Sequence, residues 1–214
     1  NPVSTVVAYN SGANTVTLIL SGGLPTSVAI VSPPSNGTAI ASGSSTVTYQ
    51  PNTGYAGPDS FTYSFNNSGG TSAPATVSVT VNDPTVTITA GGPLTGTVAV
   101  AYSQTFTFTG GAQPWSGYQV TNLPAGVAIT GTTANTVTIS GTPTQAGTFN
   151  LNVSAIDGST GNGPYTVGQA FTLTVTGPTL TLAPASPALN ATYATAFTQA
   201  FSTTGGVGPY TYAV

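Results

Sequence analysis

Alternation of apolar and polar residues with a period of two dominates this sequence. Thr or Ser alternates with Val, Ile, Leu, Phe or Tyr in many short segments, such as TVTLIL and ATVSVTV. A strand with this pattern places its apolar side chains on one face, as half-buried antiparallel strands do. We therefore predict strands at 15–20, 45–50, 60–65, 75–81, 85–90, 104–110, 135–141, 148–156 and 170–176.

Clusters of turn-forming residues separate these segments at short intervals. Examples are SGGLP at 21–25, SPPSNG at 32–37, PNTGYAGP at 51–58 and DGSTGNGP at 157–164. Gly, Pro, Asn and Ser are typical of turns between strands. No segment shows the 3.6-residue periodicity of an amphipathic helix. The pattern therefore predicts an all-β fold.

The chain contains an internal repeat. Residues 102–120 align with residues 197–214, so that Gln104 pairs with Gln199 and Gly111 with Gly206 at a spacing of 95 residues. A period of this length matches one β-sandwich of about 100 residues. It is too long for a solenoid unit or a propeller blade.

Two proline-marked links suggest where the domains end. An alternating strand breaks at Asp83-Pro84 and another at Gly177-Pro178. We predict sandwiches at 1–83 and 84–177, with 178–214 as the first strands of an incomplete third sandwich, and expect the short links to give a semi-rigid rod. A partial sheet exposes apolar faces and unpaired edges. Its missing strands are expected either from a continuing chain or from another molecule.

Two segments resemble known repeat families. LPAGVAITGTTANTVTISGTPTQAGTFNLNVSAIDG at 123–158 resembles immunoglobulin-like repeats of bacterial surface proteins, with their Leu-Pro-x-Gly, Ile-Ser-Gly-Thr-Pro and Ala-Gly-Thr-Phe motifs. PSNGTAIASGSSTVTYQPNTGYAGPDSFTYSFNNSGG at 34–70 resembles cadherin-like bacterial repeats. The resemblance implies tandem immunoglobulin-like (Ig-like) antiparallel β-sandwiches that serve as stalks, spacers or adhesive repeats of exported proteins. It also implies acidic calcium ligands at domain junctions, which this sequence almost lacks.

Charge is nearly absent. The 214 residues include no Lys, Arg, His, Cys or Met, and the only charged side chains are Asp59, Asp83 and Asp157. Average usage of roughly 25% would supply about 50 charged residues. Without cations the chain cannot bind nucleic acid or an anionic membrane surface through phosphate contacts. Lys-Asn isopeptide cross-links, disulfides and thiol-bound metals are excluded as well.

The same composition bears on location. An uncharged surface of Thr, Ser, Asn and Gly favours association, which suits a fibre or a surface layer. We therefore expect an extracellular or cell-surface protein. No apolar run approaches the roughly 20 residues of a membrane span, and no signal peptide is visible, so we expect a mature product or an excised part of a longer chain.

Catalysis can be tested against the residue inventory. Serine-type hydrolysis needs a base, and the usual His is missing. A carboxylate pair is the remaining option, but Asp59 and Asp157 fall in different predicted domains. We therefore predict no enzyme and no catalytic residue, and expect both carboxylates to accept hydrogen bonds from turn amides.

Metal and ligand sites were considered in the same way. Asn82-Asp83 offers one carboxylate and one amide for a weak calcium site, against six to eight oxygens usually needed, so we predict no metal and no cofactor. Trp115, Tyr118 and Tyr165 are candidates for a sugar-stacking platform, but Trp115 falls where a sandwich usually buries a large aromatic residue, so core packing is the favoured interpretation. N-glycosylation sequons occur at Asn36, Asn66, Asn152 and Asn190.

These observations give one leading hypothesis and one alternative. The leading hypothesis is a non-enzymatic structural repeat protein of a bacterial surface fibre, stalk or filament, which associates with identical subunits or neighbouring repeats. One version of it completes the third sandwich by strand exchange between subunits. The alternative is an adhesin or carbohydrate-binding module that uses exposed aromatic residues. Neither involves nucleic acid or membrane insertion.

Overall fold

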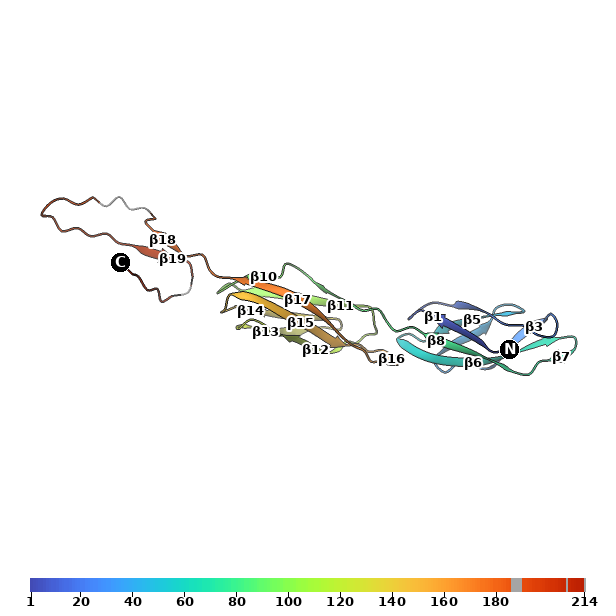
Figure 1. Cartoon of the computed structure of the whole chain (residues 1–214). Coiled ribbons are helices and arrows are strands. Elements are labelled where there is room, and N and C mark those ends of the chain that lie inside the picture. The colour runs from blue at the N-terminus through green and yellow to red at the C-terminus, as the bar shows by residue number, and fades with distance from the viewer. Residues whose placement is uncertain (186–189, 207, 214) are drawn as a thin grey trace. The chain divides into compact units, whose positions relative to one another are not determined.

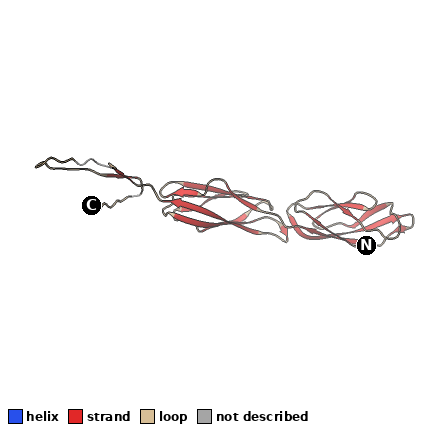
Figure 2. Cartoon of the chain, turned by 45° about the horizontal axis from the view of Figure 1, so that its top comes forward, coloured by secondary structure: helices blue, strands red, loops and turns tan. Residues whose placement is uncertain are grey.

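The computed structural model describes residues 1–185, 190–206 and 208–213. Every regular element among them is a strand, and none of these residues lies in a helix (Figure 1, Figure 2). The prediction of an all-β fold is therefore confirmed. The described part of the chain also has no helix that is long and apolar enough to cross a membrane.

The largest sheet contains six strands. Its order is β1-β8-β6-β16, and β3 and β7 also pair with β6. Strand β6 pairs with β3 and β8 in antiparallel fashion. The bounds are β1 (Val3–Val7), β3 (Ser27–Ser32), β6 (Tyr55–Asn67), β7 (Gly70–Thr71), β8 (Ala75–Val81) and β16 (Thr160–Gly161).

A three-stranded sheet, ordered β2-β5-β4, contributes to the same core. Its strands are β2 (Asn14–Thr17), β4 (Gly37–Ala41) and β5 (Thr46–Pro51). The alternating residues of β5 and β8 point inward, and the stacked rings of Tyr49 and Phe61 are 6.2 Å apart. The fully buried members of this core include Val47, Tyr49, Phe61, Tyr63 and Val77.

Two four-stranded sheets follow in the sequence, ordered β10-β17-β15-β12 and β13-β14-β11-β9. The rings of Phe106 on β11 and Phe171 on β17 join them, with centroids 4.9 Å apart. The bounds are β9 (Thr87–Ala90), β10 (Thr95–Thr97), β11 (Tyr102–Thr109), β12 (Ser116–Thr121), β13 (Val127–Thr132), β14 (Thr136–Gly141), β15 (Gly147–Ile156) and β17 (Thr166–Thr176).

In the described residues of the C-terminal segment, one short antiparallel pair forms, β18 (Thr181–Ala183) with β19 (Ser202–Thr204). Its apolar side chains are much more exposed than their counterparts in the preceding repeat. Phe106 is fully buried, whereas the equivalent Phe201 is 46% exposed. Trp115 is 4% exposed, whereas the equivalent Tyr210 is 36% exposed. The expected exposure of apolar side chains in 178–214 is confirmed for the described residues.

The contacts of the chain group it into two compact units. The first consists of Asn1–Ile88, Phe108–Tyr118 and Ser154–Gly168, and the second of Thr89–Thr107, Gln119–Val153 and Gln169–Val214. The predicted domain boundaries after residues 83 and 177 remain predictions.

Each of the nine predicted segments overlaps an observed strand, and the segment at 75–81 coincides with β8. The strand predicted at 15–20 was wrong at 18–20, because β2 ends at Thr17. The side chain of Leu18 is buried in the core, and the chain then continues to Gly22 and Gly23. The sheets also contain parallel pairs. Strands β1 and β8 are parallel, as are β10 and β17, because an early strand lies beside the last strand of the same sheet and runs the same way.

The alternation in β15 yields a matched stability test. Leu151 is fully buried, whereas its neighbour Asn152 is exposed. Leu151→Ala removes packed methyl groups and leaves a cavity, so we expect it to lower the free energy of unfolding by about 2–5 kcal/mol. Asn152→Ala should change it by less than about 0.5 kcal/mol. Denaturant unfolding measures both, and equal effects would contradict the assignment of the two faces.

Candidate functional site

Asp59 lies on β6 and accepts four hydrogen bonds. The backbone amides of Ser35, Asn36 and Ser60 donate at 3.2, 3.0 and 2.9 Å, and the Tyr49 hydroxyl donates at 2.9 Å. Burial and this contact with the carboxylate raise the pKa of Tyr49. The carboxylate therefore fastens the turn before β4 to the sheet, as predicted from the sequence.

Asp157 is the most buried carboxylate, with 2% of its surface exposed. The amides of Ala112, Ser159 and Tyr165 donate to it at 3.3, 3.2 and 2.8 Å, and the Ser159 hydroxyl donates as well. Burial raises the pKa of Asp157, but these hydrogen bonds favour the charged form and lower it overall. The prediction that Asp157 binds turn amides is confirmed.

Asp83 follows β8 and accepts a hydrogen bond from the Tyr165 hydroxyl. Burial of Tyr165, together with this bond and the negative charge of Asp83, raises the pKa of Tyr165 to about 12. Asp83 therefore does more than end a strand before proline, because it holds a tyrosine 82 residues away in the sequence.

The connection that holds Asp157 also contacts the N-terminal part of the first compact unit. The hydroxyls of Tyr9 and Ser159 are 2.8 Å apart, and the amide of Thr160 donates to the carbonyl of Gly54 at 2.9 Å. Strand β16 pairs in parallel with the start of β6 (Figure 1). Gly161 is required there, because its φ is +81° and a Cβ would lie 2.0 Å from the carbonyl oxygen of Ala56.

The predicted aromatic platform is not a shared exposed surface. Trp115 is 4% exposed, and its ring packs against Phe108 with centroids 5.2 Å apart. Tyr118 packs edge-on against the same Phe108, and the hydroxyl of Tyr165 binds Asp83. The core interpretation of Trp115 is confirmed, because its ring lies just before β12 in the buried layer.

Two cavities lie within the first compact unit. The smaller, of about 370 Å³, is lined by Tyr9, Asn10, Asn82, Asp83 and neighbouring backbone. It contains the residues considered for calcium, but it holds a single carboxylate. Across the described residues, no group of three or more His, Cys, Asp or Glu side chains comes together. The donor set therefore does not fit a calcium ion.

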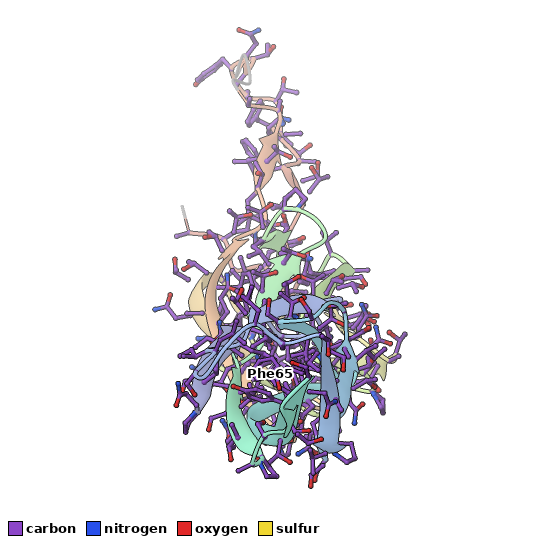
Figure 3. The ribbon with its side chains drawn as sticks, turned by 90° about the vertical axis from the view of Figure 1, so that its right-hand side faces the viewer. Phe65 is labelled. Carbon is purple, nitrogen blue, oxygen red and sulfur yellow. The ribbon has the colours of Figure 1, made fainter. Side chains whose placement is uncertain are left out.

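The larger cavity, of about 670 Å³, lies between the loop after β2 and strands β6, β7 and β8. Phe65 lies among these strands and is labelled in Figure 3. Its ring meets that of the buried Tyr63 edge-on, 5.2 Å away. No charged side chain lines it, and Ile19, Leu20 and Phe65 are combined with prolines, glycines and hydroxyl or amide side chains. No sequence pattern predicted this site, because its lining comes from segments up to 75 residues apart.

The sequons differ in accessibility. Asn152 and Asn190 are exposed, whereas Asn36 and Asn66 are half-buried. The side chain of Asn66 donates to the hydroxyl of Ser27 and accepts from that of Thr71. Glycosylation remains a sequence-based prediction at all four.

The comparisons with known proteins concern the fold. A family model of the bacterial Ig domain matches residues 2–80. No curated protein matches the sequence. The family match shows that residues 2–80 are similar to a bacterial Ig domain, and the regular elements among the described residues are all strands.

Several solved structures are similar at low identity. An endo-fucoidan hydrolase of glycoside hydrolase family 107 is 19% identical, with a TM-score of 0.37 over 83% of this chain and 28% of the hydrolase. The extracellular cadherin domains 3–6 of protocadherin Gamma B2 are 12% identical, with a TM-score of 0.35 over 87% of this chain and 49% of that one. A three-domain Ig fragment of titin is 12% identical, with a TM-score of 0.36 over 82% of this chain and 62% of the fragment. This chain therefore spans less than two thirds of each.

Replacing the buried carboxylate tests its structural role. Asp157→Asn keeps the shape but presents an amide to groups that are all donors, so we expect a loss of about 1–3 kcal/mol in the free energy of unfolding at pH 7. Asp83→Asn, at an exposed position with one partner, should cost less. Chemical denaturation of the three proteins measures this difference. An unchanged stability of Asp157→Asn would show that the hydrogen bonds around Asp157 contribute nothing.

The lowered pKa of Asp157 also predicts an acid limit of stability. The ionised Asp157 stabilises the fold fully above the unfolded pKa of about 4. This stabilisation is lost as the pH falls through the folded pKa of Asp157. We expect the melting temperature to fall below about pH 4, and to fall less steeply in Asp157→Asn. Thermal scans from pH 2 to pH 6 measure both curves, and parallel curves would contradict the shift.

An alkaline limit follows from the tyrosines. A tyrosine whose pKa is raised in the folded state contributes its full stabilisation below the unfolded pKa of about 10. That stabilisation is lost as the pH rises further. We expect Tyr165 to ionise near pH 12, and Tyr165→Phe to lose stability less steeply between pH 10 and pH 12. Ultraviolet titration of phenolate absorbance, with thermal scans, tests this. Ionisation of Tyr165 near pH 10 would contradict its bond to Asp83.

Proposed function

We propose, on the premise that residues 2–80 form a bacterial Ig domain, that this chain is a non-enzymatic structural segment of an extracellular fibre, stalk or filament. Ig-like sandwiches hold their shape through buried cores and backbone ladders, which is what a spacer or fibre segment needs. The family match supports a structural repeat of this kind. The fibre role and the extracellular location are our proposal.

The single observation that carries the proposal is that all three carboxylates accept hydrogen bonds from groups within the fold. Asp59, Asp83 and Asp157 each accept a hydrogen bond from a hydroxyl, and Asp59 and Asp157 also bind three amides each. General acid-base catalysis requires a group that can exchange a proton with a substrate. Carboxylates already engaged with backbone amides instead hold turns in place, which favours a structural role.

The outer faces of the sheets support a role in association. Hydroxyls from neighbouring strands bind one another, as between Thr105 and Thr138 at 2.8 Å and between Thr97 and Thr176 at 3.3 Å. These faces are polar but uncharged, so nothing repels a second molecule at long range. Lateral contact between such surfaces is consistent with a fibre or a surface layer.

The exposed apolar side chains of the C-terminal segment extend the proposal to self-association. Leu182 is 49% exposed, and Phe201 is 46% exposed although the equivalent Phe106 of the preceding repeat is buried. Exposed apolar surface of this kind marks an interaction site. We propose that residues 178–214 begin a third Ig-like sandwich, after domains at 1–83 and 84–177, and that further strands, from a continuing chain or from another subunit, cover them.

The adhesin alternative has less support. Its strongest candidate, Trp115, is buried against Phe108 and is therefore unavailable for stacking on a sugar ring. Binding of glycans at other aromatic residues stays a prediction from the sequence.

The proposed location and assembly are tested on the native material. Antibodies raised against residues 1–214 should label intact cells of the source bacterium without permeabilisation, because the segment lies outside the cell. Immunogold electron microscopy should place the label on extended surface structures. Label that appears only after permeabilisation would contradict the extracellular role, and label on the cell body without fibres would favour a short spacer.

A further inference from the structure

Strand β16 lies against the start of β6, although it comes much later in the sequence (Figure 1). The amide of Thr160 donates to the carbonyl oxygen of Gly54, and the amide of Asn162 donates to that of Ala56, each at 2.9 Å. Strand β6 belongs to the sheet that contains most of the segment matched by the bacterial Ig domain. The chain after Asp157 therefore adds a short strand to this sheet.

The two backbones approach closely, with a glycine on each side. Gly161 has a φ of +81°, and a Cβ there would lie 2.0 Å from the carbonyl oxygen of Ala56. Gly57 has a φ of +125°, and a Cβ there would lie 2.9 Å from the side-chain oxygen of Asn162. Glycine alone adopts such φ values without strain and leaves room for the opposite chain. The contact is therefore as close as that between neighbouring strands of one sheet.

Two tyrosine hydroxyls hold the same connection. The hydroxyl of Tyr9 lies 2.8 Å from that of the buried Ser159, and the hydroxyl of Tyr165 donates to Asp83. Tyr9 follows β1 by two residues and Asp83 follows β8 by two residues, and these strands end side by side in a parallel pair. The connection is therefore bound to the ends of β1 and β8 as well as to the start of β6.

The connection is also fixed to the segment that carries Trp115. The amide of Ala112 donates to the carboxylate of Asp157 at 3.3 Å, and the amide of Gly158 donates to the carbonyl oxygen of Ala112 at 2.8 Å. Trp115 follows three residues after Ala112 and is buried. All of these segments belong to the first compact unit. Hydrogen bonds thus link the segment of Trp115, through the chain after Asp157, to β6.

We propose that residues 157–165 form a built-in clasp, which makes residues 2–80 unfold together with the segment that carries Trp115. Parts of a protein open separately only when few contacts join them. Here the backbone bonds of β16, two tyrosine hydroxyl bonds and the bonds of Asp157 would all have to break before either part opened alone. The clasp is a property of the fold, and it does not depend on a role in a fibre.

The fluorescence of Trp115 tests this coupling in the whole chain. Trp115 is the single tryptophan of the sequence, so its signal reports on one segment. Val47 on β5 is fully buried in the core formed by residues 2–80, and Val47→Ala destabilises that core. With the clasp closed, we expect the folded-to-unfolded ratio reported by Trp115 to fall about tenfold in denaturant unfolding. A Trp115 transition that Val47→Ala leaves unshifted would overturn the proposal.

Gly161→Ala opens the clasp, because the added Cβ collides with the carbonyl oxygen of Ala56 and separates β16 from β6. In this background Val47→Ala should lose most of its effect on Trp115. Gly22→Ala is the matched control: its φ of +86° imposes similar backbone strain, but no atom lies within 4 Å of the added Cβ. The full shift should persist in the control. Equal shifts in the two backgrounds would show that the coupling does not pass through β16.

Amide hydrogen exchange, followed by NMR, measures the opening itself. In Gly161→Ala the amides of Thr160 and Asn162 should exchange about tenfold faster, because they lose their bonds to β6. Amides of β14, in the second compact unit, should keep their rates. Unchanged exchange at Thr160 and Asn162 would contradict the pairing on which the clasp depends.

A milder variant keeps the test available if Gly161→Ala does not fold. Tyr9→Phe combined with Tyr165→Phe removes both hydroxyl bonds of the clasp and keeps both rings. Val47→Ala should shift the Trp115 transition less in this background than in the otherwise unaltered chain. An undiminished shift would overturn the clasp. None of these outcomes bears on the proposed fibre role, which surface labelling of cells tests separately.

Discussion

Burial of one apolar face per strand, with hydroxyls on the other, is the constraint on which the structure depends. Strands such as β8 and β15 bury alternate Val, Leu or Ala residues and expose Ser, Thr or Asn between them. With almost no charge, the chain obtains neither solubility nor cohesion from ion pairs. Its stability has to come from packed cores, backbone ladders and hydrogen bonds between neutral groups.

Under this constraint the three aspartate carboxylates serve as hydrogen-bond acceptors within the fold. Asp59 and Asp157 each accept several hydrogen bonds at a point where the chain turns or where distant segments meet, as Asp157 does for Ala112 and Tyr165, and Asp83 accepts one from Tyr165. A charged acceptor forms stronger hydrogen bonds than a neutral one, so one aspartate can hold a connection that would otherwise need more contacts. The same engagement keeps the carboxylates from acting as acids or bases.

Exposed apolar residues carry the remaining information about function. The chain buries Phe106 and Trp115, whereas the equivalent Phe201 and Tyr210 are partly exposed among the described residues. The cavity beside Phe65 is a second uncovered surface on the same neutral molecule.

The sequence by itself determined the strands, the absence of helix and the structural role of Asp59 and Asp157. Period-two alternation and Asx turns are local patterns, so adjacent residues suffice to recognise them. Only the tertiary structure decided which strands pair in parallel, that Tyr165 reaches Asp83, and that a cavity forms around Phe65. These features join segments that are distant in the chain, and their pairing depends on the packing of whole sheets, which no local pattern encodes.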